Sequence, residues 1–417
     1  MSEWVTKPLG EMVTFQKGRK VKTSPYPLDG YREYLGAGKL SNSFDGYAST
    51  FSAVLAKESD ILMLWDGERS GLCRTELSGV VSSTVSKLTP TDSIDSSFLY
   101  YLLLQCYGWI QHRRTGTGVP HVPKDLGRIL HLSYPRNMDE QKKIARILQA
   151  IDRAIEKTEA LIDKYQKIKA GLMQDLFTRG VDSDGRMRPP REQAPKLYQK
   201  TQIGWVPREW ALSPIGSYVL SAEYGISTSL ESESVGIPVL RMNNIKANSF
   251  DVSDLKYSSD KEAYRLSLRP RDVLYNRTNS FEHVGKTAIW KGELTSCSFA
   301  SYLVRINLDL DRILPEFFAH WMSQESSQNA LRRFATPGVQ QVNINPTNLQ
   351  RVEIGVPGIV EQASIVTRLD AIDNEIEVEH QYLGKLAKQK SGLIHDLLTG
   401  KVAVQVKPDA EPEAAYV

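Results

Sequence analysis

Residues 140–178 read EQKKIARILQAIDRAIEKTEALIDKYQKIKAGLMQDLFT, and residues 361–399 read EQASIVTRLDAIDNEIEVEHQYLGKLAKQKSGLIHDLLT. The two stretches are offset by a constant 221 residues without gaps, and 17 of their 39 positions are identical. Two unrelated amphipathic helices would share a pattern but far fewer identities. The repeat therefore predicts one architectural unit that is written twice in the chain.

Each repeated stretch is predicted to be a long helix, because its apolar residues recur at the spacing of a coiled-coil seam. At 1.5 Å per residue each helix would be roughly 60 Å long, and a helix with one apolar stripe is not stable alone. We therefore expect the two helices to pack against each other. The first seam comprises Ile144, Leu148, Ile151, Ile155, Ile162, Tyr165, Leu172 and Leu176, and the second comprises Ile365, Leu369, Ile372, Ile376, Leu383, Leu386, Leu393 and Leu397.

Two lysines, Lys169 and Lys390, interrupt the two seams at equivalent positions. Two equivalent units related by a pseudo-two-fold axis would place the helices antiparallel. In the antiparallel register that aligns the seams, Lys169 lies near Asp373 and Lys390 lies near Asp152. We predict two ion pairs that set this register; the alternative is that both lysines extend past the seam into water.

The fold class expected is α+β, with two mixed α/β domains in a pseudo-two-fold repeat, separated by two long antiparallel coiled-coil helices. Both globular segments contain, in the same order, an Asp before a short apolar strand, an aromatic helix, an Arg pair and a glycine-containing loop. The predicted parts are a first domain at 1–138, a first helix at 139–178, a linker at 179–205, a second domain at 206–358, a second helix at 359–399 and a flexible tail at 400–417.

The composition is that of an ordinary soluble protein, and the net charge is only +3, from 52 basic and 49 acidic residues. Binding to nucleic acid would therefore depend on local patches or on partner proteins. The chain has no apolar run approaching the roughly 18 residues of a membrane span and no pattern of a signal peptide. Its three isolated cysteines form neither a metal cluster nor a disulfide framework, which indicates a reducing cytoplasm.

The order of these motifs resembles that of the specificity subunit of type I restriction–modification systems. The resemblance rests on two diverged segments, each followed by a long repeated helix with Glu-Gln near its start and a Gly-Leu-x-x-Asp-Leu-(Leu/Phe)-Thr close. The stretch GWVPREW at 204–210 is similar to that family's G-x-(I/V)-P-x-x-W signature. The resemblance extends from residue 1 to about residue 405.

The resemblance implies two target recognition domains, each reading one half of a split double-stranded DNA site. It also implies that the helices set the spacing between the domains and dock two methyltransferase subunits, and that restriction/translocase subunits join for cleavage. S-adenosylmethionine, ATP and Mg²⁺ are then expected on the partner subunits, with no cofactor and no metal in this chain. The expected location is the cytoplasm, without a membrane.

The sequence offers no convincing catalytic motif. An (Asn/Asp)-Pro-Pro-(Tyr/Phe) motif of an adenine methyltransferase is absent, and Gly285-Lys286-Thr287 follows Ser280 where a phosphate-binding loop needs its first glycine. We therefore predict a recognition subunit rather than an enzyme. The competing hypotheses are a protein-interaction scaffold, which the modest charge favours, and a stand-alone nuclease or methyltransferase.

Candidate DNA contacts are chosen by residue chemistry, because recognition domains are the variable part of the family. Arg and Lys suit guanine, Asn and Gln suit adenine, and Lys, Arg, Ser and Thr suit phosphates. The alternatives are solvated charge runs and, for the group at 241–246, a structural turn. The first-domain candidates are Lys17, Arg19, Lys20, Lys22, Arg69, Arg113, Arg114 and Thr115. The second-domain candidates are Arg241, Asn243, Asn244, Lys246, Arg277, Thr278, Asn279, Arg332, Arg333, Gln340, Gln341 and Asn343. His121 and His283 are interpreted as polar loop residues.

Overall fold

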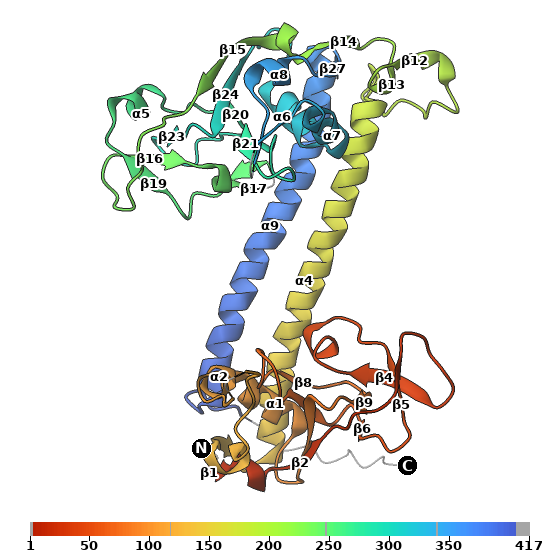
Figure 1. Cartoon of the computed structure of the whole chain (residues 1–417), viewed down its shortest axis with the longest axis vertical. Coiled ribbons are helices and arrows are strands. Elements are labelled where there is room, and N and C mark those ends of the chain that lie inside the picture. The colour runs from red at the N-terminus through yellow and green to blue at the C-terminus, as the bar shows by residue number, and fades with distance from the viewer. Residues whose placement is uncertain (1–2, 117, 247, 339–340, 406–417) are drawn as a thin grey trace, which may run out of the picture. The chain divides into compact units, whose positions relative to one another are not determined.

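The computed structural model describes residues 3–116, 118–246, 248–338 and 341–405. Residues 406–417 of the expected tail and the candidate Gln340 lie outside these ranges. The chain divides into two compact units: unit 1 is Met1–Ala160 with His380–Val417, and unit 2 is Leu161–Glu379. Both units contain a part of each long helix, since α4 runs from Met138 to Thr178 and α9 from Ile359 to Leu398 (Figure 1, yellow and blue).

Unit 1 is built on two small sheets and a strand pair. The first sheet has the order β2-β10-β7-β8, with β2 at Val13–Lys17, β10 at Val85–Pro90, β7 at Ile61–Leu64 and β8 at Cys73–Arg74. The second has the order β3-β5-β4-β9-β6, with β3 at Thr23–Ser24, β5 at Tyr47–Ser49, β4 at Tyr31–Leu35, β9 at Gly79–Val81 and β6 at Leu55–Ala56. The pair joins β1 at Trp4–Pro8 to β11 at His131–Pro135, and the helices are α1 at Ser96–Gln105, α2 at Tyr107–His112 and α3 at Leu126–Ile129.

Unit 2 repeats this plan with extra strands. Its main sheet has the order β15-β24-β20-β22, with β15 at Val219–Tyr224, β24 at Leu303–Leu308, β20 at Val273–Asn276 and β22 at Thr287–Ile289. A second sheet has the order β19-β16-β23, at Lys256–Ser258, Ile237–Leu240 and Ser298–Phe299, and a third has the order β21-β26-β25, at Thr278–Asn279, Val342–Asn343 and Thr336–Pro337. The strand pairs are β14–β27 at Ala211–Pro214 and Glu353–Val356, β12–β13 at Tyr198–Thr201 and Gly204–Pro207, and β17–β18 at Ile245–Lys246 and Ser249–Phe250. The shorter helices are α5 at Lys261–Arg265, α6 at Pro315–Ser323, α7 at Glu325–Arg332 and α8 at Pro346–Gln350.

The two units follow the same strand order. The sheet β2-β10-β7-β8 corresponds to β15-β24-β20-β22, and the pair β1–β11 corresponds to β14–β27. A parallel pair also occurs in both, β4 with β9 in unit 1 and β16 with β23 in unit 2. The α+β fold class, the internal repeat and the two long helices are confirmed. Among the described residues, none of the helices combines the length and the apolar character that a membrane crossing requires.

Each unit buries the part of the helix seams that lies beside its domain in the core of that domain. In unit 1, Ile144, Leu148 and Leu397 belong to the same buried cluster as the α1 residue Phe98. In unit 2, Ile365 and Leu369 belong to the same cluster as Phe317 of α6. All the predicted seam residues are buried or half-buried, so the predicted seam is the inner face of both helices.

The predicted ion pairs between the helices are confirmed in both units. In unit 1, Lys390 Nζ lies 2.5 Å from Asp152 Oδ1, and that carboxylate also accepts a hydrogen bond of 2.7 Å from the Tyr101 hydroxyl. In unit 2, Lys169 pairs with Asp373. The lysine side chains are only 29% and 15% exposed, so they do not extend past the seam into water. Both pairs fit the antiparallel alignment expected from the repeat.

The glutamine of the first Glu-Gln motif joins the first domain to its helix. Gln141 is fully buried, and its side-chain oxygen accepts a hydrogen bond of 2.7 Å from the Asp95 N–H at the start of α1. Its side-chain nitrogen donates to the Pro135 carbonyl at 2.8 Å and to the Ser93 carbonyl at 3.4 Å. One side chain therefore connects α4 to the end of β11 and to the loop before α1.

Gln362 plays the same part in unit 2. It is fully buried, and its side-chain oxygen accepts a hydrogen bond of 2.8 Å from the Leu314 N–H before α6. Its side-chain nitrogen donates to the Arg312 and Pro357 carbonyls, both at 2.9 Å. Since buried backbone groups need partners, this explains why the two repeats share Gln beside Glu at their start.

Unit 2 has a further contact between its domain and its helix. The His320 ring on α6 lies with Nε2 3.0 Å from Asp370 Oδ1 on α9, and His320 is only 6% exposed. The hydrogen bond from His320 holds the pKa of the Asp370 carboxyl below its ordinary value, although partial burial opposes this. The contact therefore stabilises unit 2 when the Asp370 carboxyl is ionised.

We predict that Gln141→Leu destabilises unit 1 and that Gln362→Leu destabilises unit 2. Leucine is similar in size but leaves buried N–H and C=O groups unpaired, at about 1–3 kcal/mol for each such group. Hydrogen exchange should show faster exchange around Asp95 for the first variant and around Leu314 for the second. Gln166→Leu, on an exposed position of α4, is the matched control and should leave exchange unchanged. Equal effects of all three variants would contradict this role.

The lowered pKa of Asp370 predicts a pH dependence with a defined sign. A carboxyl whose pKa is lower in the folded state contributes stability above the unfolded pKa of about 3.9, and this is lost as the pH falls through the folded pKa. Asp370→Asn removes the contribution. The difference in unfolding temperature between wild type and Asp370→Asn should therefore shrink as the pH falls from about 6 to below 4. A constant difference at every pH would exclude this.

Candidate nucleic-acid interface

The basic loop after β2 is exposed in the first domain. Arg19, Lys20 and Lys22 are exposed, as is Arg69 in the turn between β7 and β8. Lys17, the last residue of β2, is half-exposed and already paired, with its Nζ 2.9 Å from Asp66 Oδ2. The loop thus offers exposed cations for phosphates at its tip and a cation paired with a carboxylate at its base.

The two adjacent arginines of the first domain, Arg113 and Arg114, make different contacts. The Arg113 guanidinium lies over the Trp109 ring, 3.9 Å from its centroid, and remains exposed. Arg114 donates from Nε to the Gln111 carbonyl at 2.9 Å and from Nη1 to the Glu68 carbonyl at 2.6 Å. Arg114 therefore holds the backbone together, whereas Arg113 and its exposed neighbour Thr115 face solvent.

The group at 241–246 in the second domain is largely a structural turn. Asn244 is 3% exposed; its Oδ1 accepts from the Arg241 N–H at 2.8 Å, and its Nδ2 donates to the carbonyls of Asp251 and Asp254, both at 2.8 Å. Arg241 pairs with the Asp254 carboxylate at 2.8 Å. The exposed side chains of this group are Asn243 and Lys246, the latter paired with Asp251.

The other candidate arginines of the second domain differ in how far their guanidinium groups are engaged in contacts within the domain. Arg277 donates from Nε to the Ser301 carbonyl at 2.9 Å, and its guanidinium lies 5.0 Å from the centroid of the Tyr224 ring. Arg332 donates to Asn329 and to a backbone carbonyl, both at 3.2 Å. Arg333 is exposed.

The sheet β21-β26-β25 brings four candidate polar residues together. Thr278 and Asn279 form β21, and Asn343 lies opposite Thr278 on β26. Asn343 Nδ2 donates to Thr278 Oγ1 at 2.7 Å. Thr278, Asn343 and Gln341 line an open pocket of about 700 Å³. An amide-lined, open cavity of this kind can accept the hydrogen-bonding edge of a base.

The first domain carries a charged cluster that the sequence pattern did not reveal. His121 Nδ1 lies 2.7 Å from Asp66 Oδ1, and the second oxygen of Asp66 holds Lys17. His121 faces Asp66 and Thr115 across two isolated backbone bridges. Sequence reasoning treats His121 as an ordinary loop residue because its partner is 55 residues away along the chain.

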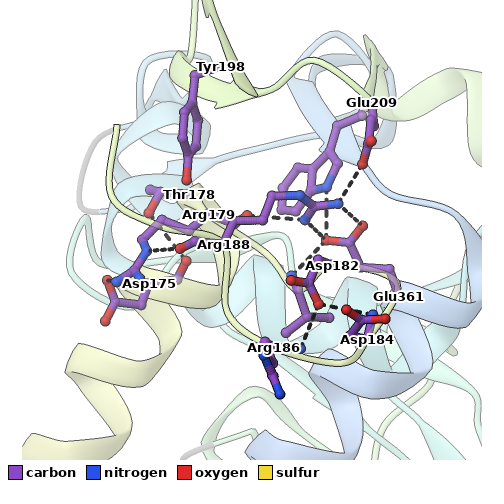
Figure 2. A network of polar contacts seen from close by, with 12 residues as sticks. Asp175, Thr178, Arg179, Asp182, Asp184, Arg186, Arg188, Tyr198, Glu209 and Glu361 are labelled. Carbon is purple, nitrogen blue, oxygen red and sulfur yellow. Dashed lines mark hydrogen bonds and ion pairs between the residues drawn. The ribbon is translucent and has the colours of Figure 1, made fainter. Parts of the chain in front are cut away.

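A polar network centred on the buried Arg188 fixes the linker at the start of the second domain (Figure 2). Arg188 from the linker forms hydrogen bonds to Glu361 at 2.5 and 3.0 Å and to Glu209 at 2.7 Å. The Trp210 indole N–H and the Val181 N–H also donate to Glu361, at 3.1 and 2.9 Å. The network explains why the Glu of the Glu-Gln repeat and the Trp of GWVPREW are needed together.

The network is structural in character. Burial alone would lower the pKa of Arg188, but Glu361 and Glu209 raise it, so the cation is retained. The glycine Gly180, at φ +63°, is required here because a Cβ atom would lie 2.1 Å from Glu361 Oε1. Every partner is provided by unit 2 itself, so Arg188 joins the linker to the domain and to α9.

A family model described as type I restriction modification DNA specificity domain matches residues 1–164 and 207–388. The specificity subunit of the type I restriction enzyme MjaVIII from Methanocaldococcus jannaschii is 27% identical over 415 residues, covering 97% of this chain and 94% of that protein. The specificity subunit of type I restriction enzyme EcoKI from Escherichia coli is 22% identical, covering 88% and 82%.

A solved structure has the same fold. The crystal structure of the type I restriction–modification S subunit from M. genitalium superposes with a TM-score of 0.62 at 15% identity, covering 95% of this chain and 96% of that one.

The role of Arg188 is testable by unfolding. Arg188→Met should destabilise unit 2 by about 3–5 kcal/mol, because it leaves the largely buried Glu361 carboxylate without its cation. Adding Glu361→Gln should recover part of this loss. Arg191→Met is the matched control and should cost much less, since Arg191 is exposed and its pair with Glu192 and its stacking on the Trp205 ring are surface contacts. Thermal unfolding measures all three, and equal losses for Arg188→Met and Arg191→Met would refute the account.

Proposed function

Because the chain belongs to the family of type I restriction–modification DNA specificity subunits, we propose that each of its domains reads one half of a two-part DNA sequence. The chain is a DNA-recognition subunit rather than an enzyme, and specificity subunits of this kind assemble with methyltransferase and restriction subunits. The finer assignment proposed here is that α4 and α9 set the spacing between the half-sites and dock two methyltransferase subunits.

The observation that carries the proposal is a shared frame with different surface chemistry. The same strand order occurs in both domains, and each domain is joined to a long helix by an equivalent buried glutamine. The polar groups at the surface of the two domains differ, with Lys17 and the half-buried His121 in the first domain and the half-buried Thr278 and Asn343 in the second. A duplicated frame with two chemistries suits two different half-sites.

The helices support the proposed spacing role through their continuity. A half-site spacing must be set by a rigid connection, since both readers have to match the turn of the DNA helix. The helices α4 and α9 are uninterrupted over 41 and 40 residues. The Lys–Asp pair of each unit opposes sliding of one helix past the other.

We also propose that S-adenosylmethionine, ATP and Mg²⁺ bind to the partner subunits and that the complex acts in the cytoplasm. The cofactor assignment follows from the division of labour within the family. The location is supported by Cys73, Cys106 and Cys297, which are all free cysteines.

Mapping of methylated adenines tests the proposed function. Genomic DNA from cells that carry the chain should show a methylated two-part motif, and deletion of the chain should remove methylation from that motif. Restoring the wild-type chain should restore it. Unchanged methylation after deletion would contradict the proposal and leave the interaction scaffold as the better hypothesis.

A further inference from the structure

Backbone hydrogen bonds fix the position of Asn343 in the second domain. The Ile344 N–H donates to the Arg277 carbonyl at 2.8 Å, and the Arg277 N–H donates to the Tyr302 carbonyl at 2.9 Å. Ile344 is 1% exposed and belongs to the core. Successive side chains of a strand point to opposite faces. Asn343, the neighbour of Ile344, therefore points away from the core, toward Thr278 and the pocket.

The first domain has the same backbone bonds at the equivalent point. The Val122 N–H donates to the Trp65 carbonyl at 2.9 Å, and the Trp65 N–H donates to the Thr84 carbonyl at 2.8 Å. Val122 is fully buried, so its neighbour His121 points outward and meets Asp66. Val122 thus corresponds to Ile344, and His121 corresponds to Asn343.

Asn343 retains the groups that adenine recognition needs. An amide has two donor hydrogens and one acceptor oxygen. The bond to Thr278 uses one hydrogen and is the one side-chain bond of Asn343 within the part of the chain that the structure describes. The oxygen and the second hydrogen can then meet the N6 and N7 groups of adenine. Thr278 is a positioning residue, because it fixes the plane of the amide.

The equivalent point of the first domain suits a different base. Asp66 holds His121 with one oxygen and Lys17 with the other. The Lys17 ammonium has three donors, of which Asp66 takes one. Guanine presents two acceptors, N7 and O6, on its major-groove edge. The side chains of Lys17 and His121 are 49% and 45% exposed, so both are accessible to DNA.

We propose that these equivalent points determine specificity, with Asn343 reading an adenine in one half-site and Lys17, held with His121 by Asp66, reading a guanine in the other. The inference rests on the proposed function and adds which residues read which class of base. Two other candidates of the second domain, Asn244 and Arg277, are committed to internal contacts. Asn343 combines the suitable chemistry with access to the pocket.

The test replaces single side chains in the full chain within its natural complex and maps the methylated motif. Asn343→Asp keeps the shape of the residue but removes its donors, so the base preferred at one position of one half-site should change by roughly tenfold or more. Thr278→Val should weaken the preference at that same position, and Thr278→Ser, which keeps the hydroxyl, should restore it. Lys17→Met should alter one position of the other half-site alone.

Each half-site is the internal control for the variant in the other domain. The inference would be overturned if the methylated motif were the same in Asn343→Asp and Lys17→Met as in the wild type. This holds whether methylation is retained or is reduced equally at every site. An effect of Asn243→Ala on base identity, together with none from Asn343→Asp, would likewise overturn it. The proposed function is judged separately, because the wild-type motif and its loss on deletion do not depend on these variants.

Discussion

A buried glutamine side chain, Gln141 in unit 1 and Gln362 in unit 2, joins each recognition domain to the start of the long helix that follows it. Each makes three hydrogen bonds to backbone groups of its domain. Without the glutamine, these backbone groups would be left unpaired in the core. The combined cost would be comparable to a large part of a domain's free energy of unfolding. The orientation of each domain on its own helix segment follows from this contact.

The other contacts within each unit work in the same direction. In unit 2, Arg188 joins the linker to Glu361, which is next to Gln362, and His320 joins α6 to Asp370, about two turns further along α9. The Lys–Asp pair then fixes the helix segments against each other. A reader that is held this firmly can discriminate bases by side-chain chemistry, because the position of the side chain does not adapt to a wrong base.

Local periodicity made much of this fold predictable. The helices, their seams and the pairs of Lys169 and Lys390 follow from spacing and from the repeat. The cluster of Lys17, Asp66 and His121 did not, because strand pairing brings together residues that are far apart in sequence. For the same reason the suitability of Asn244 for DNA could not be judged from residue type, since its amide is consumed by a turn.

The Arg188 network shows a further limit. A linker rich in proline, glycine and charge is typical of a mobile segment. Its one buried arginine is distinguished only by the carboxylates of Glu209 and Glu361 in the folded unit. The signature Trp of GWVPREW has no physical explanation until its indole N–H is seen to donate to Glu361.

We propose that the two domains share one frame and present different base-reading side chains at equivalent points of it. The most direct measurement is a structure of the complex bound to its two-part DNA site. We expect the Asn343 amide to lie within hydrogen-bonding distance of a base edge in one half-site and the Lys17 ammonium to lie within that distance of a base edge in the other. Finding both side chains on phosphates, or turned away from the DNA, would contradict it.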